Sequence, residues 1–200
     1  MFKNIKQNNG SFEFQLLNSD KIYKASQKSD IISYFCNFLN KESFDIIIEL
    51  GTFTGGLSIV LNEIIKKNQF KTKIYTFDIA KKFNKNVEEY YKENNIQFLI
   101  GSCFSEEIID YIKNLIKNKR VCLLCDNGNK VNEFSIYSKI ISEKDFIMAH
   151  DYKNDLNPTF CDWKWHEIKF SQIKNYIEEN NLKIYKDINF EEVAWCCYFK

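Results

Sequence analysis

The feature that most constrains the fold is the stretch at residues 46–59, IIIELGTFTGGLSI. A run of β-branched residues ends beside Glu49, and a turn that contains three of the six glycines of the chain follows. Apolar residues with helical spacing begin at Leu57, so the stretch predicts a buried strand, a tight turn and a helix. Gly51 lets the backbone turn sharply, and the free N–H groups at the helix start point toward the same place as a bound ligand.

The spacing of the glycines distinguishes between two kinds of nucleotide site. The dinucleotide fingerprint is G-x-G-x-x-G, whereas this chain has E-x-G-x-x-x-G-G, with Glu49 where the first glycine would stand. The pattern resembles the first motif of class I S-adenosylmethionine-dependent methyltransferases. An ordinary strand–turn–helix with incidental glycines is the alternative. The resemblance implies that S-adenosylmethionine binds at five residues of this motif: Glu49, Gly51, Thr52, Gly55 and Gly56.

Composition limits the class of protein. Two hundred residues suggest one domain, and a net charge of +1 without a basic block argues against a nucleic-acid partner. No apolar run approaches the length of a membrane span, and the first residues lack the apolar core of a signal peptide. Seven cysteines, several of them in apolar runs, fit a reducing compartment better than a disulfide scaffold. We therefore expect a single cytoplasmic domain over residues 1–200.

Strand-like and helix-like segments alternate along most of the chain. Residues 1–20 are expected to be a loosely ordered lead-in, followed by a helix from about Ser29 that Asp30 caps. The predicted strands after the run at Ile46 cover residues 73–79, 96–100, 121–125, 145–149, 182–185 and 193–199, and the predicted helices include 106–117, 134–141 and 171–180. We therefore predict an α/β fold that is Rossmann-like and doubly wound. It has a mostly parallel seven-stranded sheet, an antiparallel C-terminal strand and helices on both faces.

Polar residues stand at the ends of several predicted strands, where ligands bind in sheets of this kind. Asp78 ends the strand after the glycine turn and can accept hydrogen bonds from both hydroxyls of a ribose. Ser102 and Cys103 end the next strand, and the resemblance implies that they contact the adenine.

A second group of polar residues follows the next two strands. Asp126 ends one, and His150 and Asp151 end the other, so neighbouring strands would bring the three side chains together. Two carboxylates at such a short distance repel each other, so keeping both ionised is unfavourable unless a cation lies beside them. Oxygen ligands favour magnesium, calcium or manganese, and a histidine shifts the preference toward manganese or a later metal. Asp126, His150 and Asp151 are therefore the candidate ligands of a divalent metal.

The block at residues 21–151 is similar to the metal-dependent sugar and small-molecule O-methyltransferases, a group that includes cephalosporin hydroxylase-like and macrolide-sugar methyltransferases. The chain departs from that group at His150, where a glutamate is usual, and in the turn after Asp126, which lacks the histidine base. Related catechol-type enzymes use a lysine in this turn, which makes Lys130 a candidate general base that must be neutral to act. His150 is the alternative base, and Asp126 is also placed beside the cofactor.

We therefore expect an S-adenosylmethionine-dependent O-methyltransferase, assisted by magnesium or manganese, that methylates a hydroxyl of a sugar, nucleotide sugar or related small molecule. One alternative is a metal-independent enzyme with His150 as base, and another is a cofactor-binding partner subunit without chemistry of its own. The aromatic loop at residues 152–170 is the expected acceptor side, with Trp163 and Trp165 either stacking on the acceptor or packing the loop down. No membrane or nucleic-acid partner is expected, and a homo-oligomeric state is left open.

Overall fold

The computed structural model describes all 200 residues and centres on a seven-stranded sheet with the strand order β11-β12-β8-β7-β4-β5-β6. Its strands are β4 (Ile46–Leu50), β5 (Lys73–Asp78), β6 (Gln97–Ile100), β7 (Val121–Cys125), β8 (Phe146–His150), β11 (Lys183–Ile184) and β12 (Trp195–Phe199). The ladders among β4 to β8 are parallel, whereas β12 pairs antiparallel with both β8 and β11. The predicted doubly wound sheet with an antiparallel C-terminal strand is confirmed.

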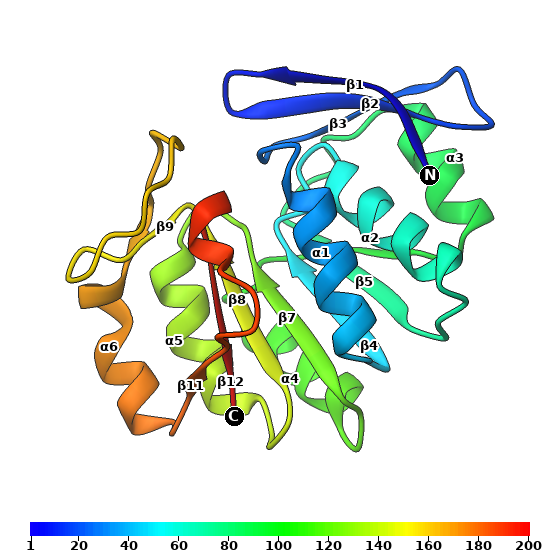
Figure 1. Cartoon of the computed structure of the whole chain (residues 1–200). Helices are drawn as coiled ribbons and strands as arrows, with labels where there is room; N and C mark the ends of the chain where they lie inside the picture. The colour runs from blue at the N-terminus through cyan, green and yellow to red at the C-terminus, as the bar shows by residue number, and fades with distance from the viewer.

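Helices cover both faces of this sheet and bury two separate cores (Figure 1). The helices are α1 (Ile31–Lys41), α2 (Gly56–Lys67), α3 (Lys85–Glu93), α4 (Glu106–Ile116), α5 (Lys130–Ile140) and α6 (Phe170–Glu179). Alternate residues of one strand enter opposite cores: Ile47 of β4 packs with α1, α2 and α3, while Ile48 packs with α4, α5 and α6. Both faces of the central strands are therefore apolar, as expected for a parallel sheet covered on both sides.

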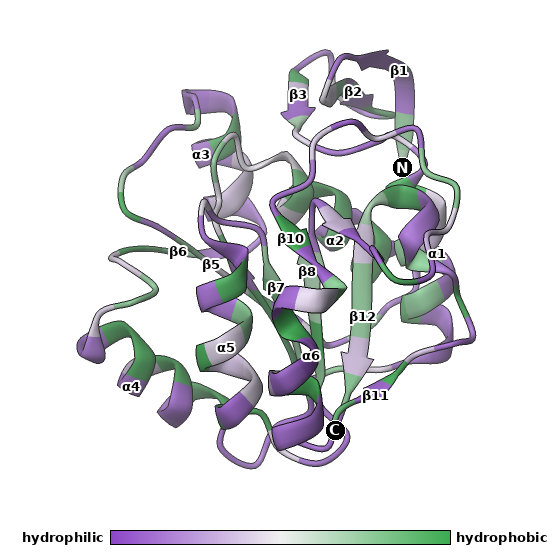
Figure 2. Ribbon diagram, turned by 90° about the vertical axis from the view of Figure 1, so that its left-hand side faces the viewer, coloured by the Kyte–Doolittle hydropathy of each residue, from purple (hydrophilic) through white to green (hydrophobic).

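The lead-in is a correction to the sequence-based expectation. Instead of being loosely ordered, it forms a three-stranded antiparallel sheet of β1 (Phe2–Asn8), β2 (Ser11–Leu16) and β3 (Ile22–Ala25). The cause is a period of two in β2, which buries Phe12 and Phe14 fully, together with a hairpin turn at Asn9-Gly10. β1 is hydrophilic and mostly exposed, as its purple colour shows (Figure 2), which hides the strand in the sequence.

Two irregular regions gather at the carboxyl ends of the central strands. The small β1-β2-β3 sheet lies across this edge, and the loop between β9 (Tyr152–Lys153) and β10 (Ile168–Lys169) rises beside it (Figure 1). The loop is irregular as predicted, apart from the short parallel ladder of β9 with β10 that closes its base. Asp30 stands at the start of α1 but its side chain makes no capping hydrogen bond, which corrects that detail. No helix of the protein is long and apolar enough to cross a membrane.

Candidate active site

One continuous cavity of about 1160 Å³ opens at the carboxyl edge of the sheet and joins the glycine turn to the second group of polar strand ends. Five stretches far apart in the sequence contribute to its wall: residues 7–10, 26–30, 49–57, 126–130 and 162–167, together with Asp78, Lys82, His150 and Asp151. Most of these residues are polar. The sheet, the N-terminal hairpin and the aromatic loop therefore form the cavity wall together.

The glycine turn passes so close to its neighbours that side chains are excluded. Gly51 has φ +98°, and a Cβ there would lie 2.4 Å from the carbonyl oxygen of Asp126. A Cβ at Gly56 would lie 2.0 Å from the carbonyl oxygen of Lys24, which shortly precedes the cavity residues 26–30. The absence of side chains at these glycines lets the glycine turn pack against the backbone at Asp126 and Lys24. It also leaves the backbone of the turn accessible from the cavity.

Glu49 borders the cavity but is almost completely buried. Ser58 Oγ and Thr76 Oγ1 each donate to its Oε2 at 2.5 Å. Burial raises the pKa of Glu49 to about 8, an effect that the two hydroxyl donors reduce and that the charges of Asp126 and Asp78 increase. Because this pKa lies close to neutral pH, a cation placed beside the carboxyl group would lower the pKa and ionise the group.

Asp78 lies at the end of β5 and lines the same cavity. Its Oδ2 accepts a hydrogen bond of 2.9 Å from the backbone N–H of Phe53, and its Oδ1 lies 3.5 Å from Lys82 Nζ. The carboxylate thus orders the loop after Gly51 and still presents oxygen acceptors beside it. This is the placement predicted for a residue that binds the ribose hydroxyls.

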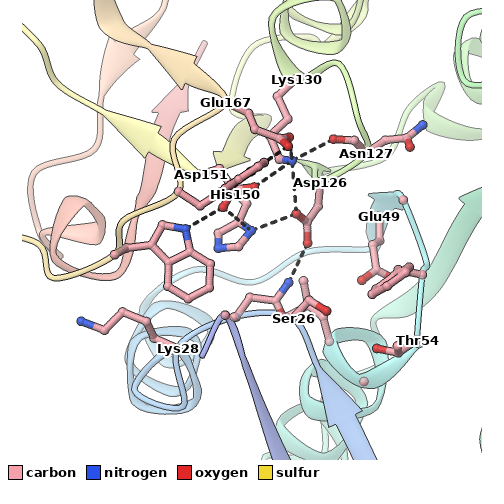
Figure 3. A pocket seen from close by; sticks show the side chains of 18 of the residues that line it. Ser26, Lys28, Glu49, Thr54, Asp126, Asn127, Lys130, His150, Asp151 and Glu167 are labelled. Atoms are coloured by element: carbon pink, nitrogen blue, oxygen red, sulfur yellow. Dashed lines mark hydrogen bonds and ion pairs between the residues drawn. The ribbon is translucent and has the colours of Figure 1, made fainter. Parts of the chain in front are cut away.

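The strand ends of β7 and β8 bring Asp126, His150 and Asp151 together, as predicted from the sequence (Figure 3). His150 Nδ1 lies 3.0 Å from Asp126 Oδ1 and 3.5 Å from Asp151 Oδ1. The ring of His150 stacks on Trp195 at a centroid distance of 4.9 Å, which fixes its plane, and its Nε2 is buried without a partner. One ligand atom from each of the three residues lies within 4.8 Å of the others, which is compatible with a divalent metal.

Lys130 inserts its ammonium into the same cluster from the start of α5. Its Nζ lies 2.6 Å from Glu167 Oε2, 3.0 Å from Asp151 Oδ2 and 3.9 Å from Asp126 Oδ1, and it also donates to the carbonyl oxygen of Asn127. Burial disfavours the ammonium, but Asp126, Asp151 and Glu167 outweigh this effect and raise the pKa of Lys130. The arrangement therefore holds Lys130 charged rather than neutral, contrary to the requirement for a base.

Donors from outside the strand ends also contact the carboxylates of the two aspartates. Gln27 Nε2 donates to Asp126 Oδ2 at 2.7 Å, and Trp163 Nε1 donates to Asp151 Oδ1 at 2.7 Å. Neither bond, nor the pairing of Glu167 with Lys130, could be assigned from the sequence, because all three contacts join segments whose relative position only the fold determines. The two donors help to fix the orientation of both carboxylates.

Some predicted site residues lie elsewhere. Ser102 and Cys103 do not line the cavity; Cys103 is buried, and its carbonyl oxygen accepts from Tyr137 Oη at 2.7 Å. Gly55 also stays outside the cavity wall, and its carbonyl oxygen accepts from Tyr91 Oη at 3.1 Å. The predicted adenine contact of Ser102 and Cys103 therefore finds no support in the shape of the cavity.

The strand order, the glycine turn and the acids at the strand ends define the protein as a member of the class I methyltransferase fold. The family model of rhamnosyl O-methyltransferase/CmcI matches residues 12–195. The chain therefore belongs to this family, and the resemblance drawn from the sequence is confirmed. No curated protein matches the chain.

Solved structures agree in fold at low sequence identity. A structure of CmcI with Mg and SAM is 12% identical, with a TM-score of 0.62, over 88% of this chain and 73% of that one. An SAH-bound methyltransferase from Podospora anserina is 11% identical, with a TM-score of 0.53, over 85% of this chain and 78% of that one. An apo structure of CmcI is 14% identical, with a TM-score of 0.50, over 62% of this chain, and the match spans only 53% of that protein.

Proposed function

We propose that the protein transfers the methyl group of S-adenosylmethionine to a hydroxyl of a sugar, nucleotide sugar or related small molecule, assisted by a divalent metal. The observation that carries the proposal is the continuous cavity of about 1160 Å³ between the glycine turn and the Asp126 cluster. Its volume exceeds the roughly 300–1,000 Å³ of a site for one drug-sized ligand, so a cofactor and an acceptor have room side by side. Family membership supports the same reaction.

The two ends of the cavity suit the two ligands. At one end, Gly51 and Thr52 present backbone beside a cofactor and Asp78 offers oxygens for ribose hydroxyls. At the other end, the wall is mostly polar, with the exposed ring of Trp165 at its rim, which suits a carbohydrate better than an apolar acceptor. Both ligands meet at Asp126, the residue shared by the two ends.

The residues of the cluster fit a divalent ion. Asp126, His150 and Asp151 would each hold a magnesium or manganese ion through one oxygen or nitrogen atom. His150 Nδ1 lies 3.0 Å from Asp126 Oδ1 and 3.5 Å from Asp151 Oδ1, while Gln27 and Lys130 hold the other oxygens of the two carboxylates. Such an ion would supply a Lewis acid that lowers the pKa of an acceptor hydroxyl.

The reaction itself is a displacement at the methyl carbon. An acceptor oxygen forms the new C–O bond as the C–S bond breaks, the sulfonium leaves as a neutral thioether, and the hydroxyl proton passes to a base in the cavity wall. His150 is the candidate for that base where its ring does not bind the metal, whereas Lys130 qualifies only if the bound ion lowers its raised pKa. The protein's contribution is to hold both partners in line and to exclude water, since positioning supplies much of the rate.

The test is transfer of a labelled methyl group from S-adenosylmethionine to a panel of sugars, nucleotide sugars and phenols. We expect a product with a sugar acceptor, loss of turnover after chelation and recovery with magnesium or manganese. Asp151→Asn should lower turnover by roughly 100-fold or more and weaken manganese binding, while binding of S-adenosylhomocysteine stays near normal. The backbone at Asp151 has φ +57°, which asparagine tolerates, so the fold should survive.

Asp110→Asn is the matched control because Asp110 is exposed on α4, far from the cavity. Full turnover by chelated protein with no metal by elemental analysis would exclude metal assistance and favour His150 as base, as its hydrogen bond to Asp126 allows. Tight cofactor binding without transfer to any acceptor would instead favour a partner subunit that lacks chemistry of its own.

A further inference from the structure

The side-chain amide of Gln27 has a hydrogen-bonded N–H group and a carbonyl oxygen without a hydrogen-bond partner. The side chain is 2% exposed, and its Nε2 donates to Asp126 Oδ2 at 2.7 Å. A carboxylate can only accept, so this contact fixes the orientation of the amide and turns Oε1 away from Asp126. Oε1 is buried without any hydrogen-bond partner, although the residue lines the cavity.

The position of Gln27 is fixed relative to the glycine turn. Thr54 Oγ1 donates to the carbonyl oxygen of Lys24 at 2.7 Å, and Gly56 packs directly on the same carbonyl group. Gln27 follows three residues later and reaches Asp126 on the other side of the cavity opening. In Figure 3 its neighbours Ser26 and Lys28 lie on the wall opposite Lys130 and Glu167. The amide therefore stands between the cofactor end and the acceptor end.

A buried carbonyl oxygen without a donor is costly, by roughly 1–3 kcal/mol, and such groups are rare in folded proteins. A ligand that donates a hydrogen bond there removes the cost. The surrounding wall is acidic, because seven carboxyl groups border the cavity against four lysines, with Asp78 and Asp126 among the acids. An acidic wall favours a donor that carries positive charge over a neutral hydroxyl.

We propose that Gln27 Oε1 accepts a hydrogen bond from the α-ammonium group of S-adenosylmethionine while the amide N–H of Gln27 keeps Asp126 oriented toward the acceptor. The proposal rests on the proposed function. It makes Gln27 a cofactor-binding residue that also positions Asp126, and it links occupancy of the cofactor end to the geometry of the cluster that handles the acceptor.

The experiment compares two ligands that differ in the amino-acid part. S-adenosylhomocysteine carries the α-ammonium group, whereas 5′-methylthioadenosine has the same nucleoside without it. Gln27→Met keeps the size of the side chain and removes both hydrogen bonds. Measured by calorimetry, Gln27→Met should weaken the binding of S-adenosylhomocysteine by about 10-fold or more and leave the affinity for 5′-methylthioadenosine unchanged. Gln97→Met is the control because Gln97 is exposed on β6, outside the cavity.

Gln27→Glu separates a direct contact from an effect through Asp126. Glutamate still offers an oxygen acceptor but loses the amide donor, so it should retain affinity for S-adenosylhomocysteine if the contact is direct. Equal losses with both ligands, no loss in Gln27→Met, or the same loss in Gln27→Glu would each overturn the proposal. Failure of the wild-type protein to bind either ligand would overturn the proposed function instead.

Discussion

At the scale of single residues, the site consists of side chains that have only some of their partners. Asp78 accepts from the Phe53 N–H, Glu49 accepts from two hydroxyls, and Gln27 donates to Asp126, yet each borders open space. Structural polar groups are normally saturated within the protein. Partial saturation beside a cavity is the arrangement expected where a ligand completes the hydrogen bonds.

Replacing Asp78 tests the cofactor end. Asp78→Ala should weaken the binding of S-adenosylhomocysteine by roughly 1.5–3 kcal/mol, because charge-assisted hydrogen bonds to the ribose are lost. The fold should persist, since the residue lies at a strand end. Calorimetry measures the affinity, and Asp110→Ala, at an exposed position of α4, is the control. An unchanged affinity would mean that the ribose is held by other groups.

Glu49 makes stability depend on pH. Its pKa is raised to about 8 in the folded protein, chiefly by burial, from 4.5 in an unfolded chain. The folded state therefore binds more protons than the unfolded state between these values, and stability falls as the pH rises through this window. Glu49→Gln should remove this loss and stabilise the ligand-free protein at pH 8, relative to pH 5, by on the order of 3 kcal/mol.

Urea denaturation at the two pH values measures the difference. Glu107→Gln provides the control, because Glu107 is exposed on α4 and should leave the pH dependence unchanged. A wild-type stability that rises between pH 5 and pH 8, with the same slope in Glu49→Gln, would contradict the assignment of this effect to Glu49.

At the scale of elements, the loop between β9 and β10 is attached to the sheet through a few polar contacts. Lys130 pairs with Glu167, Trp163 donates to Asp151, and Lys28 pairs with Asp162. Near the tip, Thr159 donates to Glu191 at 2.8 Å, while the neighbouring Phe160 is 87% exposed. The position of the acceptor wall therefore depends on charges that come from outside the loop.

Lys130→Met should loosen this attachment. Methionine fills the same space but leaves Asp126, Asp151 and Glu167 without their shared cation, which costs on the order of 3–5 kcal/mol for a buried pair. Brief trypsin treatment should then cut the loop at Lys153 or Lys164 faster than in the wild-type protein. Lys139→Met, at an exposed position of the same helix, is the control. Equal cleavage rates would show that the loop is held by other contacts.

The central elements could be predicted from the sequence because each buried strand is a short apolar run with a polar residue at its end, as in Val121–Cys125 followed by Asp126. β1 was not predicted because its residues are mostly hydrophilic, and only its partner β2 buries apolar side chains. The strand ends predicted Asp126, His150 and Asp151 as neighbours. The bonds from Gln27 and Glu167 depend on how loops fold over the sheet, which no local pattern encodes.

At the scale of the whole molecule, ligand binding should stabilise the fold. S-adenosylhomocysteine at about 100 times its Kd adds roughly 2.7 kcal/mol, which for a chain of this size raises Tm by about 5–10 °C. NAD should give no shift, because the turn lacks the dinucleotide spacing. Gly51→Ala should abolish the shift, whereas Gly128→Ala should keep it, since a Cβ at Gly128 meets nothing within 4 Å. An equal shift with NAD would contradict the proposed cofactor.

The division of the cavity wall between buried strand ends and overlying loops has an evolutionary consequence. The cofactor end is built on Gly51 and Asp78, whose surroundings tolerate little change, while the rim comes from residues 162–167 of the loop between β9 and β10. Mutations at exposed positions of that segment, such as Trp165, can accumulate without disturbing the core. Under the proposed function, relatives with this sheet can diverge in the molecule they modify while they keep one cofactor, and exchange of residues 162–167 between them would be the direct route to a new acceptor.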